Sequence, residues 1–216
     1  MPDRLLVIGN RNYSSWSLRP WLLLRQLDVP FAEERVALDQ SDTRARILAH
    51  SPAGQVPVLV EGPLRVWGSL AIIEHVAESI RAVWPAEPAA RAMARSIAAE
   101  MHSGFSALRS ELPMNVRATR RRVQPSQRAR ADIARVQAIW SGARDAHGAA
   151  GPWLLGAFSA ADAMFAPVAS RFRTYGIDLP EPLARWQATV LDSPPMREWT
   201  AAAKAEPEVI EHEEVG

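Results

Sequence analysis

The spacing of apolar and polar residues changes near residue 80. Before that point, "RLLVIG" at 4–9 is a short apolar run, and "FAEERVAL" at 31–38 alternates with the period of two that is typical of strands. The stretch "QVPVLVEGPLRVWG" at 55–68 holds two more β runs, separated by the turn signal Glu61-Gly62-Pro63. Helical spacing predicts helices over 15–27, 43–49 and 69–80. The predicted order is therefore βαβαββα.

After Pro85 and Pro88 the strand signals stop. The chain becomes rich in alanine, with apolar residues three and four apart, and we predict helices near 89–111, 127–147, 160–174, 183–192 and 195–204. This pattern predicts an α/β domain over 1–81 and an all-helical domain over 88–216. The linker is expected in "AVWPAEP" at 82–88. The fold class is α/β followed by all-α.

Composition excludes several functions. With 216 residues and 48% hydrophobic residues, the chain can bury a substantial core. Its 25 basic and 24 acidic residues leave a net charge of +1, which provides no overall field for nucleic acid or an acidic membrane. No apolar run approaches the roughly 18 residues that span a bilayer, and no leader is evident, so we expect a cytoplasmic protein. Because the sequence has no cysteine, a protein thiol cannot act as nucleophile or ligand.

The segment "YSSWSLR" at 13–19 places hydroxyls where a strand gives way to a helix. The free N–H groups and the dipole of a helix N-terminus favour a negative charge there. A hydroxyl of Ser14 or Ser15 at this point could donate to a bound anion, although either serine could instead only cap the helix.

Three other segments complete a recognisable pattern: "SPAGQVPVL" at 51–59, "VWGSLAIIEH" at 66–75 and "GAFSAADAMFAPV" at 156–168. In the last of these, Ser159 and Asp162 have the spacing of a reciprocal helix cap. Together with the serine corner and the order of elements, these segments resemble the glutathione transferases of the serine type, zeta-like and theta-like. The resemblance implies a thioredoxin-like first domain that binds glutathione and a helical second domain that forms the acceptor side of the cleft.

The resemblance also implies roles for individual residues. Ser14 or Ser15 stabilises the glutathione thiolate, with Tyr13 as a competing donor. A cis Val56-Pro57 bond presents the Val56 backbone to the cysteinyl part of glutathione, and Ser69 binds the γ-glutamyl carboxylate. Gly68 departs from the pattern, which usually has an acidic or amide side chain there. The glutathione-binding residues are expected to be Tyr13, Trp16, Gln55, Val56, Pro57, Gly68 and Ser69.

The acceptor side is less clearly marked. His102, Phe105 and Arg109 would share one face of the predicted helix 89–111, either as a core face or as a wall for the acceptor substrate. The five histidines lack paired metal-ligand spacing, so no metal is expected. We expect the basic cluster "RATRRRV" at 117–123 to be a solvated loop, or else to attract an anionic substrate, and the acidic segment 206–216 to be a solvated end.

The expected activity is attack by bound glutathione on a small electrophile, as in detoxifying transferases. Two alternatives remain open: a zeta-like cis–trans isomerase of the maleylacetoacetate type, which would use glutathione as a cofactor, and a non-catalytic binding or regulatory module. The expected partners are glutathione and the electrophile, with no nucleic acid and no membrane. The resemblance also suggests a homodimer.

Overall fold

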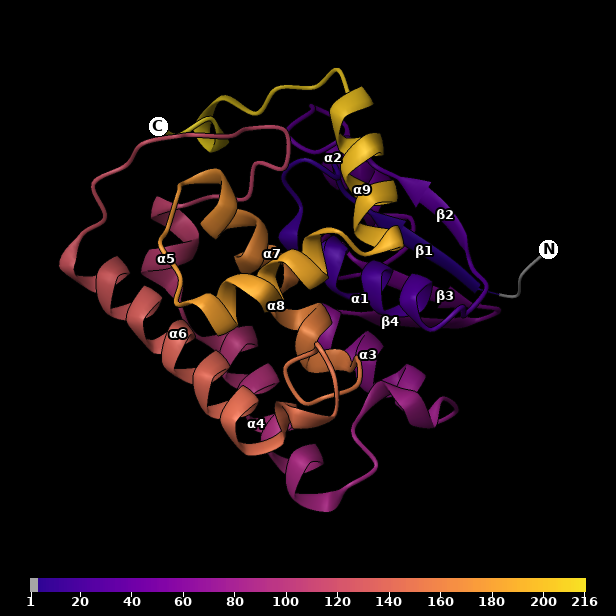
Figure 1. Ribbon diagram of the computed structural model, residues 1–216. Coiled ribbons are helices and arrows are strands. Elements are labelled where there is room, and N and C mark those ends of the chain that lie inside the picture. Colours follow the sequence, from indigo (N-terminus) through magenta and orange to yellow (C-terminus); the bar gives the residue numbers. More distant parts are fainter. Residues whose placement is uncertain (1–3) are drawn as a thin grey trace.

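The computed structural model describes residues 4–216 and contains one mixed sheet with helices on both faces, followed by helices only (Figure 1). The strand order is β2-β1-β3-β4. Strand β1 pairs in parallel with β2, and β3 pairs antiparallel with both β1 and β4. The strands are β1 (Arg4–Ile8), β2 (Ala32–Arg35), β3 (Val58–Glu61) and β4 (Leu64–Trp67). The predicted order of elements and the turn after Glu61 are confirmed.

The alternation of β1 divides the core between the two faces of the sheet. Leu6 and Ile8 belong to the large buried cluster that contains apolar residues of α1 (Ser15–Gln26) and α3 (Ser69–Ala77). Val7 points to the other face, where it joins a small cluster with Ile47 of α2 (Thr43–Leu48). Both faces of β1 are therefore covered, and the carboxyl end of the strand leads directly into the serine corner.

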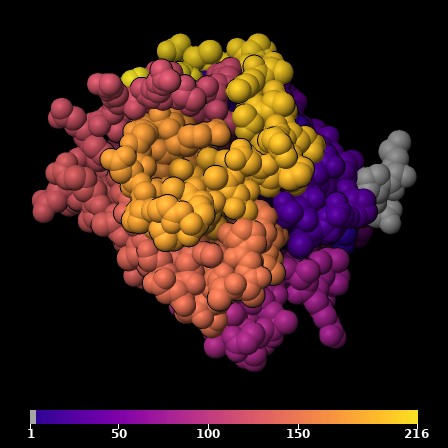
Figure 2. All heavy atoms as spheres, viewed as in Figure 1, coloured from indigo at the N-terminus to yellow at the C-terminus, as the bar shows by residue number. Residues whose placement is uncertain are grey.

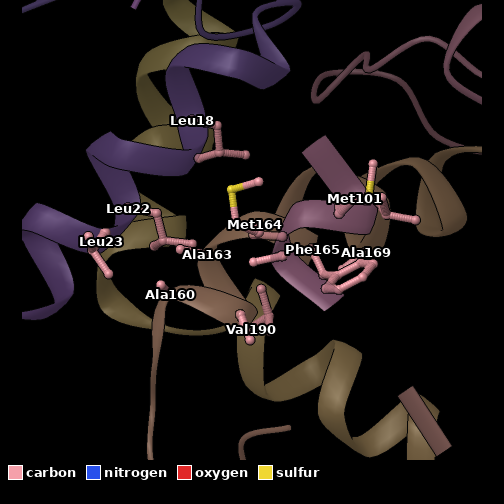
Figure 3. Packing of buried hydrophobic residues seen from close by; sticks show 14 of the residues in the cluster. Leu18, Leu22, Leu23, Met101, Ala160, Ala163, Met164, Phe165, Ala169 and Val190 are labelled. Atoms are coloured by element: carbon pink, nitrogen blue, oxygen red, sulfur yellow. The ribbon is translucent and has the colours of Figure 1, made fainter. Parts of the chain in front are cut away.

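Helix α7 (Ala160–Thr174) is the centre of the helical part. Every residue of α7 except Arg173 is buried, as expected for a helix surrounded by protein. It packs against α1, α4 and α8, and Figure 3 shows Leu22 of α1 beside Ala163 and Leu18 of α1 beside Met164. One continuous core therefore joins the two parts of the chain. The other helices here are α4 (Pro88–Ser103), α5 (Ser106–Glu111), α6 (Gln127–His147), α8 (Glu181–Leu191) and α9 (Pro194–Ala205), with short 3-10 turns at Arg81–Val83, Gly148–Ala150 and Glu211–Glu213.

The predicted helix 89–111 is wrong, because the chain breaks it into α4 and α5. A Cβ at Gly104 would lie 2.9 Å from the carbonyl oxygen of Glu100, and Phe105 takes a left-handed conformation with φ of 58°. Phe105 is buried in the core, whereas His102 and Arg109 lie on different helices. The shared face predicted for these three residues does not exist. The two polar residues still meet at the turn, where Arg109 Nη1 donates to the carbonyl of His102 at 3.4 Å.

The reciprocal cap predicted for Ser159 and Asp162 is confirmed. Ser159 is the N-cap of α7, and the Asp162 carboxylate accepts from the Ser159 N–H at 3.0 Å. The same buried carboxylate also accepts from the Leu154 N–H and from Trp186 Nε1, each at 2.9 Å. Burial raises the pKa of Asp162 to about 6. The cap therefore connects α7 to the preceding loop and to α8.

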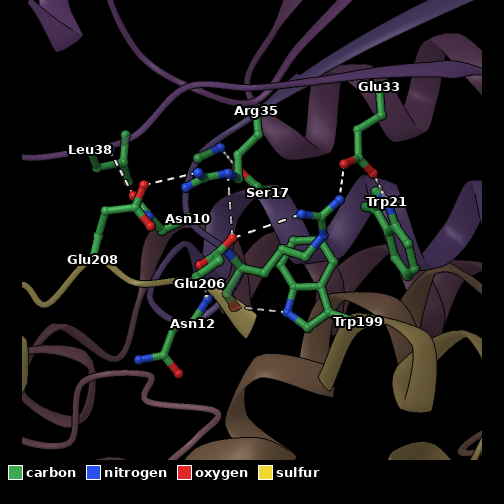
Figure 4. A network of polar contacts seen from close by, with 12 residues as sticks. Asn10, Asn12, Ser17, Trp21, Glu33, Arg35, Leu38, Trp199, Glu206 and Glu208 are labelled. Atoms are coloured by element: carbon green, nitrogen blue, oxygen red, sulfur yellow. Dashed lines mark hydrogen bonds and ion pairs between the residues drawn. The ribbon is translucent and has the colours of Figure 1, made fainter. Parts of the chain in front are cut away.

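The C-terminal segment, residues 206–216, is not a solvated end. Figure 2 shows the yellow end of the chain running along the top of the molecule beyond α9 (Pro194–Ala205). Glu206 accepts from the N–H groups of Arg11 and Asn12 at 2.8 and 3.2 Å, and Glu208 pairs with Arg35 at 2.9 Å (Figure 4). The prediction failed because the carboxylates of this segment find cations on β2 and on the loop after β1.

Candidate functional site

A cleft of about 750 Å³ lies between the sheet and the helical part. One wall comes from the serine corner and from residues 54–57 and 67–69. The opposite wall comes from His102, Arg109 and Arg171, with Ile210, His212 and Glu213 of the C-terminal segment. All the residues predicted for the site line this cleft except Phe105.

The two serines of the corner differ in their surroundings. Ser14 is the N-cap of α1: its Oγ accepts from the Ser17 N–H at 3.4 Å and lies 2.7 Å from Ser17 Oγ. Ser15 is the first residue of α1 and borders the cleft, and its hydroxyl has no hydrogen-bond partner among residues 4–216. The hydroxyl of Ser14 is thus used to cap α1, whereas the hydroxyl of Ser15 can donate to a ligand.

Tyr13 is held by the C-terminal segment. Its hydroxyl donates to Glu214 Oε1 at 2.6 Å and accepts from Arg117 Nη2 at 2.7 Å and from the Ile210 N–H at 3.3 Å. Burial, together with the hydrogen bond to Glu214, raises the pKa of Tyr13. Arg121 also donates to Glu214, so the basic cluster 117–123 is not the solvated loop that we predicted. The Tyr13 hydroxyl therefore uses its proton in the hydrogen bond to Glu214 and has none to donate to a ligand in the cleft.

Helix α3 brings a second N-terminus to the same cleft. The Val56-Pro57 peptide bond is cis, and neither the N–H nor the C=O of Val56 bonds to another residue of 4–216. Ser69 opens α3, is fully buried, and its Oγ has no partner in that range. Gly68 has φ of 86°, a conformation that strains residues with a Cβ. The backbone path into α3 therefore explains the glycine at a position where the resemblance implies a longer side chain.

Positive charge surrounds Trp16, where the serine corner meets the helical wall. The Arg19 and Arg109 guanidinium carbons lie 4.2 and 4.9 Å from the centre of the Trp16 ring, and the His102 ring meets it edge-on at 5.3 Å. Burial and then the nearby charges of Arg19 and Arg109 lower the pKa of His102. His102 therefore contributes a neutral ring at neutral pH, and the charge belongs to the arginines.

Several residues of the cleft escaped the sequence-based predictions. Arg171 lies within α7, and its approach to the cleft depends on how α7 packs against the other helices. Ile210, His212 and Glu213 reach the cleft only because the C-terminal segment folds back. The acidic composition of that segment was the available signal, since its charge is opposite to that of the basic cluster 117–123.

Among residues 4–216, no helix has both the length and the apolarity needed to cross a membrane.

These features define a class: a thioredoxin-like sheet joined to a helical part, with a polar cleft between them. Residues 13–79 match the family model of the glutathione S-transferase N-terminal domain. A curated relative, the dichloromethane dehalogenase of Methylorubrum extorquens, is 42% identical over 55 residues, which are 24% of this chain and 19% of that protein. The match thus spans about a fifth of the length of that relative.

Solved structures extend the likeness to nearly the whole chain. A glutathione transferase homologue from Burkholderia gl BGR1 with bound glutathione superposes with a TM-score of 0.69, at 21% identity over 94% of this chain and 99% of that one. A theta class glutathione S-transferase from Xanthomonas axonopodis pv. citri, also with glutathione bound, gives 0.65 at 23% identity over 93% and 98% of the two chains. Residues 13–79 thus match the N-terminal domain of the glutathione S-transferase family, and nearly the whole chain shares the fold of these solved structures.

Proposed function

We propose that the chain is a glutathione transferase of the serine type, in which the Ser15 hydroxyl donates to the glutathione thiolate. The observation that carries the proposal is the arrangement of donors in one cleft. The hydroxyls of Ser15 and Ser69 stand at the N-termini of α1 and α3, and the unpaired backbone of Val56 lies between the two helices in the sequence. These groups suit an extended peptide that carries one anion at Ser15 and another at Ser69.

Each part of glutathione has a proposed partner. The γ-glutamyl carboxylate accepts from Ser69 and the free N–H groups of the first turn of α3. The cysteinyl backbone pairs with Val56 in antiparallel fashion. Trp16, Gln55 and Pro57 border the peptide, and Gly68 adds no side-chain contact, so Ser69 and the backbone carry most of the affinity at that end. The glutathione sulfur then lies at the N-terminus of α1, beside Ser15.

The proposed reaction is nucleophilic attack by the thiolate on a small electrophile. The sulfur forms a bond to carbon, and the leaving group departs with the electron pair of the bond that breaks. The cleft contributes by holding both reactants together and by keeping the thiol ionised at neutral pH. No covalent bond to the protein is needed, in accord with a chain that has no cysteine.

Calorimetric titration with glutathione, followed by turnover assays, tests this proposal. We expect binding, and conjugation of a halo-aromatic substrate that falls at least tenfold at neutral pH in Ser15→Ala, since a charged hydrogen bond stabilises by about 1.5–3 kcal/mol. Binding with turnover only of a maleylacetoacetate-type substrate would indicate the isomerase alternative. Absence of glutathione binding would contradict the proposal and leave a non-catalytic module.

The resemblance also leads us to propose a cytoplasmic homodimer that acts in detoxification and uses no metal. Light scattering of the purified protein tests the dimer. A mass corresponding to a single chain of 23.8 kDa at micromolar concentration would rule the dimer out under those conditions.

A further inference from the structure

Three arginines near the acceptor side of the cleft lack carboxylate partners. Arg19 and Arg171 are 1% and 5% exposed, and Arg109 is half-buried. None of the three takes part in the ion pairs found among residues 4–216, although nine other arginines do. Burying a guanidinium without a counter-ion costs free energy, so a cluster of this kind needs a physical explanation.

The hydrogen-bonding groups of the cluster are only partly used. Arg171 Nη1 donates to the carbonyls of Arg109 and Leu112 at 3.3 and 3.2 Å, but its Nε has no partner. Nε and Nη1 of Arg19 are likewise buried without a partner in the described chain. Buried donors in native proteins are nearly always satisfied, so the Nε of Arg171, which lines the cleft, is available to an acceptor there.

Trp16 links the cluster to the place where chemistry is proposed. It follows Ser15 directly, lines the cleft, and has Arg19 and Arg109 against its ring. Arg109 and Arg171 line the same cleft from α5 and α7. A group held between these two arginines therefore lies on the helical side of the proposed position of the sulfur.

The nearby acidic groups do not neutralise the cluster. Asp132 attracts Arg109 and Glu213 attracts Arg171, but neither carboxylate comes within 4.0 Å of those side chains, and Asp132 already accepts from the Leu108 N–H at 3.0 Å. Burial and the charge of Arg109 lower the pKa of Arg171 to about 10, so it stays charged at neutral pH. The cleft therefore keeps net positive charge on its acceptor side.

We propose that Arg109 and Arg171 bind the carboxylate of an anionic electrophile, so that the preferred substrates of this cleft are small organic acids with a carbon open to thiolate attack. Arg19, beneath Trp16, adds positive charge and fixes the ring that the substrate contacts. The planar guanidinium suits a carboxylate, because it can donate two parallel hydrogen bonds. This inference rests on the proposed function, since it places the acid next to bound glutathione.

Two product analogues that differ only in charge test the inference. S-(2-carboxyethyl)glutathione carries a carboxylate beyond the sulfur, and S-(2-carbamoylethyl)glutathione carries an amide of the same shape. We expect calorimetry at pH 7 to show the acid binding at least about tenfold more tightly than the amide, which corresponds to 1.4 kcal/mol. In Arg109→Gln the preference should fall below about threefold, while the affinity for glutathione itself stays within about twofold of wild type.

Arg135→Gln is the matched control, because Arg135 is an exposed arginine that pairs with Glu100 on the outside of the helices. It should keep the full preference for the acid. Equal binding of the acid and the amide by wild type, with glutathione still bound, would overturn this inference alone. A loss of glutathione affinity in Arg109→Gln as large as the loss for the acid would show that the arginines serve glutathione and would overturn it as well. Failure of glutathione to bind wild type would overturn the proposed function, and this inference with it.

Discussion

Removal of one hydroxyl, in Tyr13→Phe, should release the C-terminal segment without changing the chemistry of the thiol. The hydroxyl joins three groups, with distances of 2.6 Å to Glu214, 2.7 Å to Arg117 and 3.3 Å to the Ile210 N–H. Tyr13 is only 5% exposed, so water cannot easily replace these bonds. Two of the partners are charged, and hydrogen bonds to charged groups stabilise by about 1.5–3 kcal/mol each.

Part of that stabilisation is retained when the segment is released, because Glu214 and Arg117 are partly exposed and become hydrated. The salt bridge from Arg35 to Glu208 also stays. We therefore expect the free energy of local opening to fall by about 2–4 kcal/mol, which accelerates hydrogen exchange by about 30- to 1,000-fold. The amides to follow are those of Glu213 and Glu214, which donate to Ile210 and Glu211 at 2.9 and 3.1 Å.

Tyr175→Phe is the control, because the Tyr175 hydroxyl donates to the Pro113 carbonyl at 3.1 Å and not to the C-terminal segment. It should leave exchange in residues 206–216 unchanged. Equal exchange in wild type and Tyr13→Phe would refute the anchoring role of Tyr13. A rise in the pKa of bound glutathione in Tyr13→Phe would show that tyrosine, and not Ser15, is the thiolate donor.

Three further predictions concern stability. Asp162→Ala leaves the buried donors of Leu154, Ser159 and Trp186 without an acceptor. It should lower the free energy of unfolding, measured in urea, by about 3–5 kcal/mol, and the folded fraction should keep its affinity for glutathione. Because the native pKa of Asp162 is about 6, above the unfolded value of about 3.9, wild-type stability should fall as pH rises from about 4 to about 6, and Asp162→Asn should remove that slope. Gly68→Ala should cost about 1–2 kcal/mol through backbone strain alone, since its Cβ meets nothing within 4 Å, whereas the helical control Gly142→Ala should be neutral or stabilising.

Local signals account for the parts of the fold that the sequence predicted. The apolar run of β1, the turn at Gly62-Pro63 and the spacing of Ser159 and Asp162 each act within a few residues, so they are visible in the chain itself. The break at Gly104 was missed because a lone glycine is tolerated in many helices, and the approach of the Glu100 carbonyl, which excludes a Cβ, appears only in three dimensions.

The composition of the site depends on contacts between distant residues. The bond from Tyr13 to Glu214 joins positions 201 apart, and no period or spacing encodes such a pairing. The sequence could indicate that a serine binds the thiolate, but it left Ser14 and Ser15 as alternatives. Their different partners, a cap for one and none for the other, follow from how α1 begins at the end of β1.

The pKa of the glutathione thiol in the complex tests the central claim most directly. Thiolate absorbance in the ultraviolet, titrated against pH, should give a pKa about 1 to 2 units higher in Ser15→Ala than in wild type, because each unit corresponds to 1.36 kcal/mol of a charged hydrogen bond worth about 1.5–3 kcal/mol. Ser14→Ala should destabilise α1 but leave this pKa nearly unchanged. An unchanged pKa in Ser15→Ala, with glutathione still bound, would contradict the assignment of Ser15 as the thiolate donor.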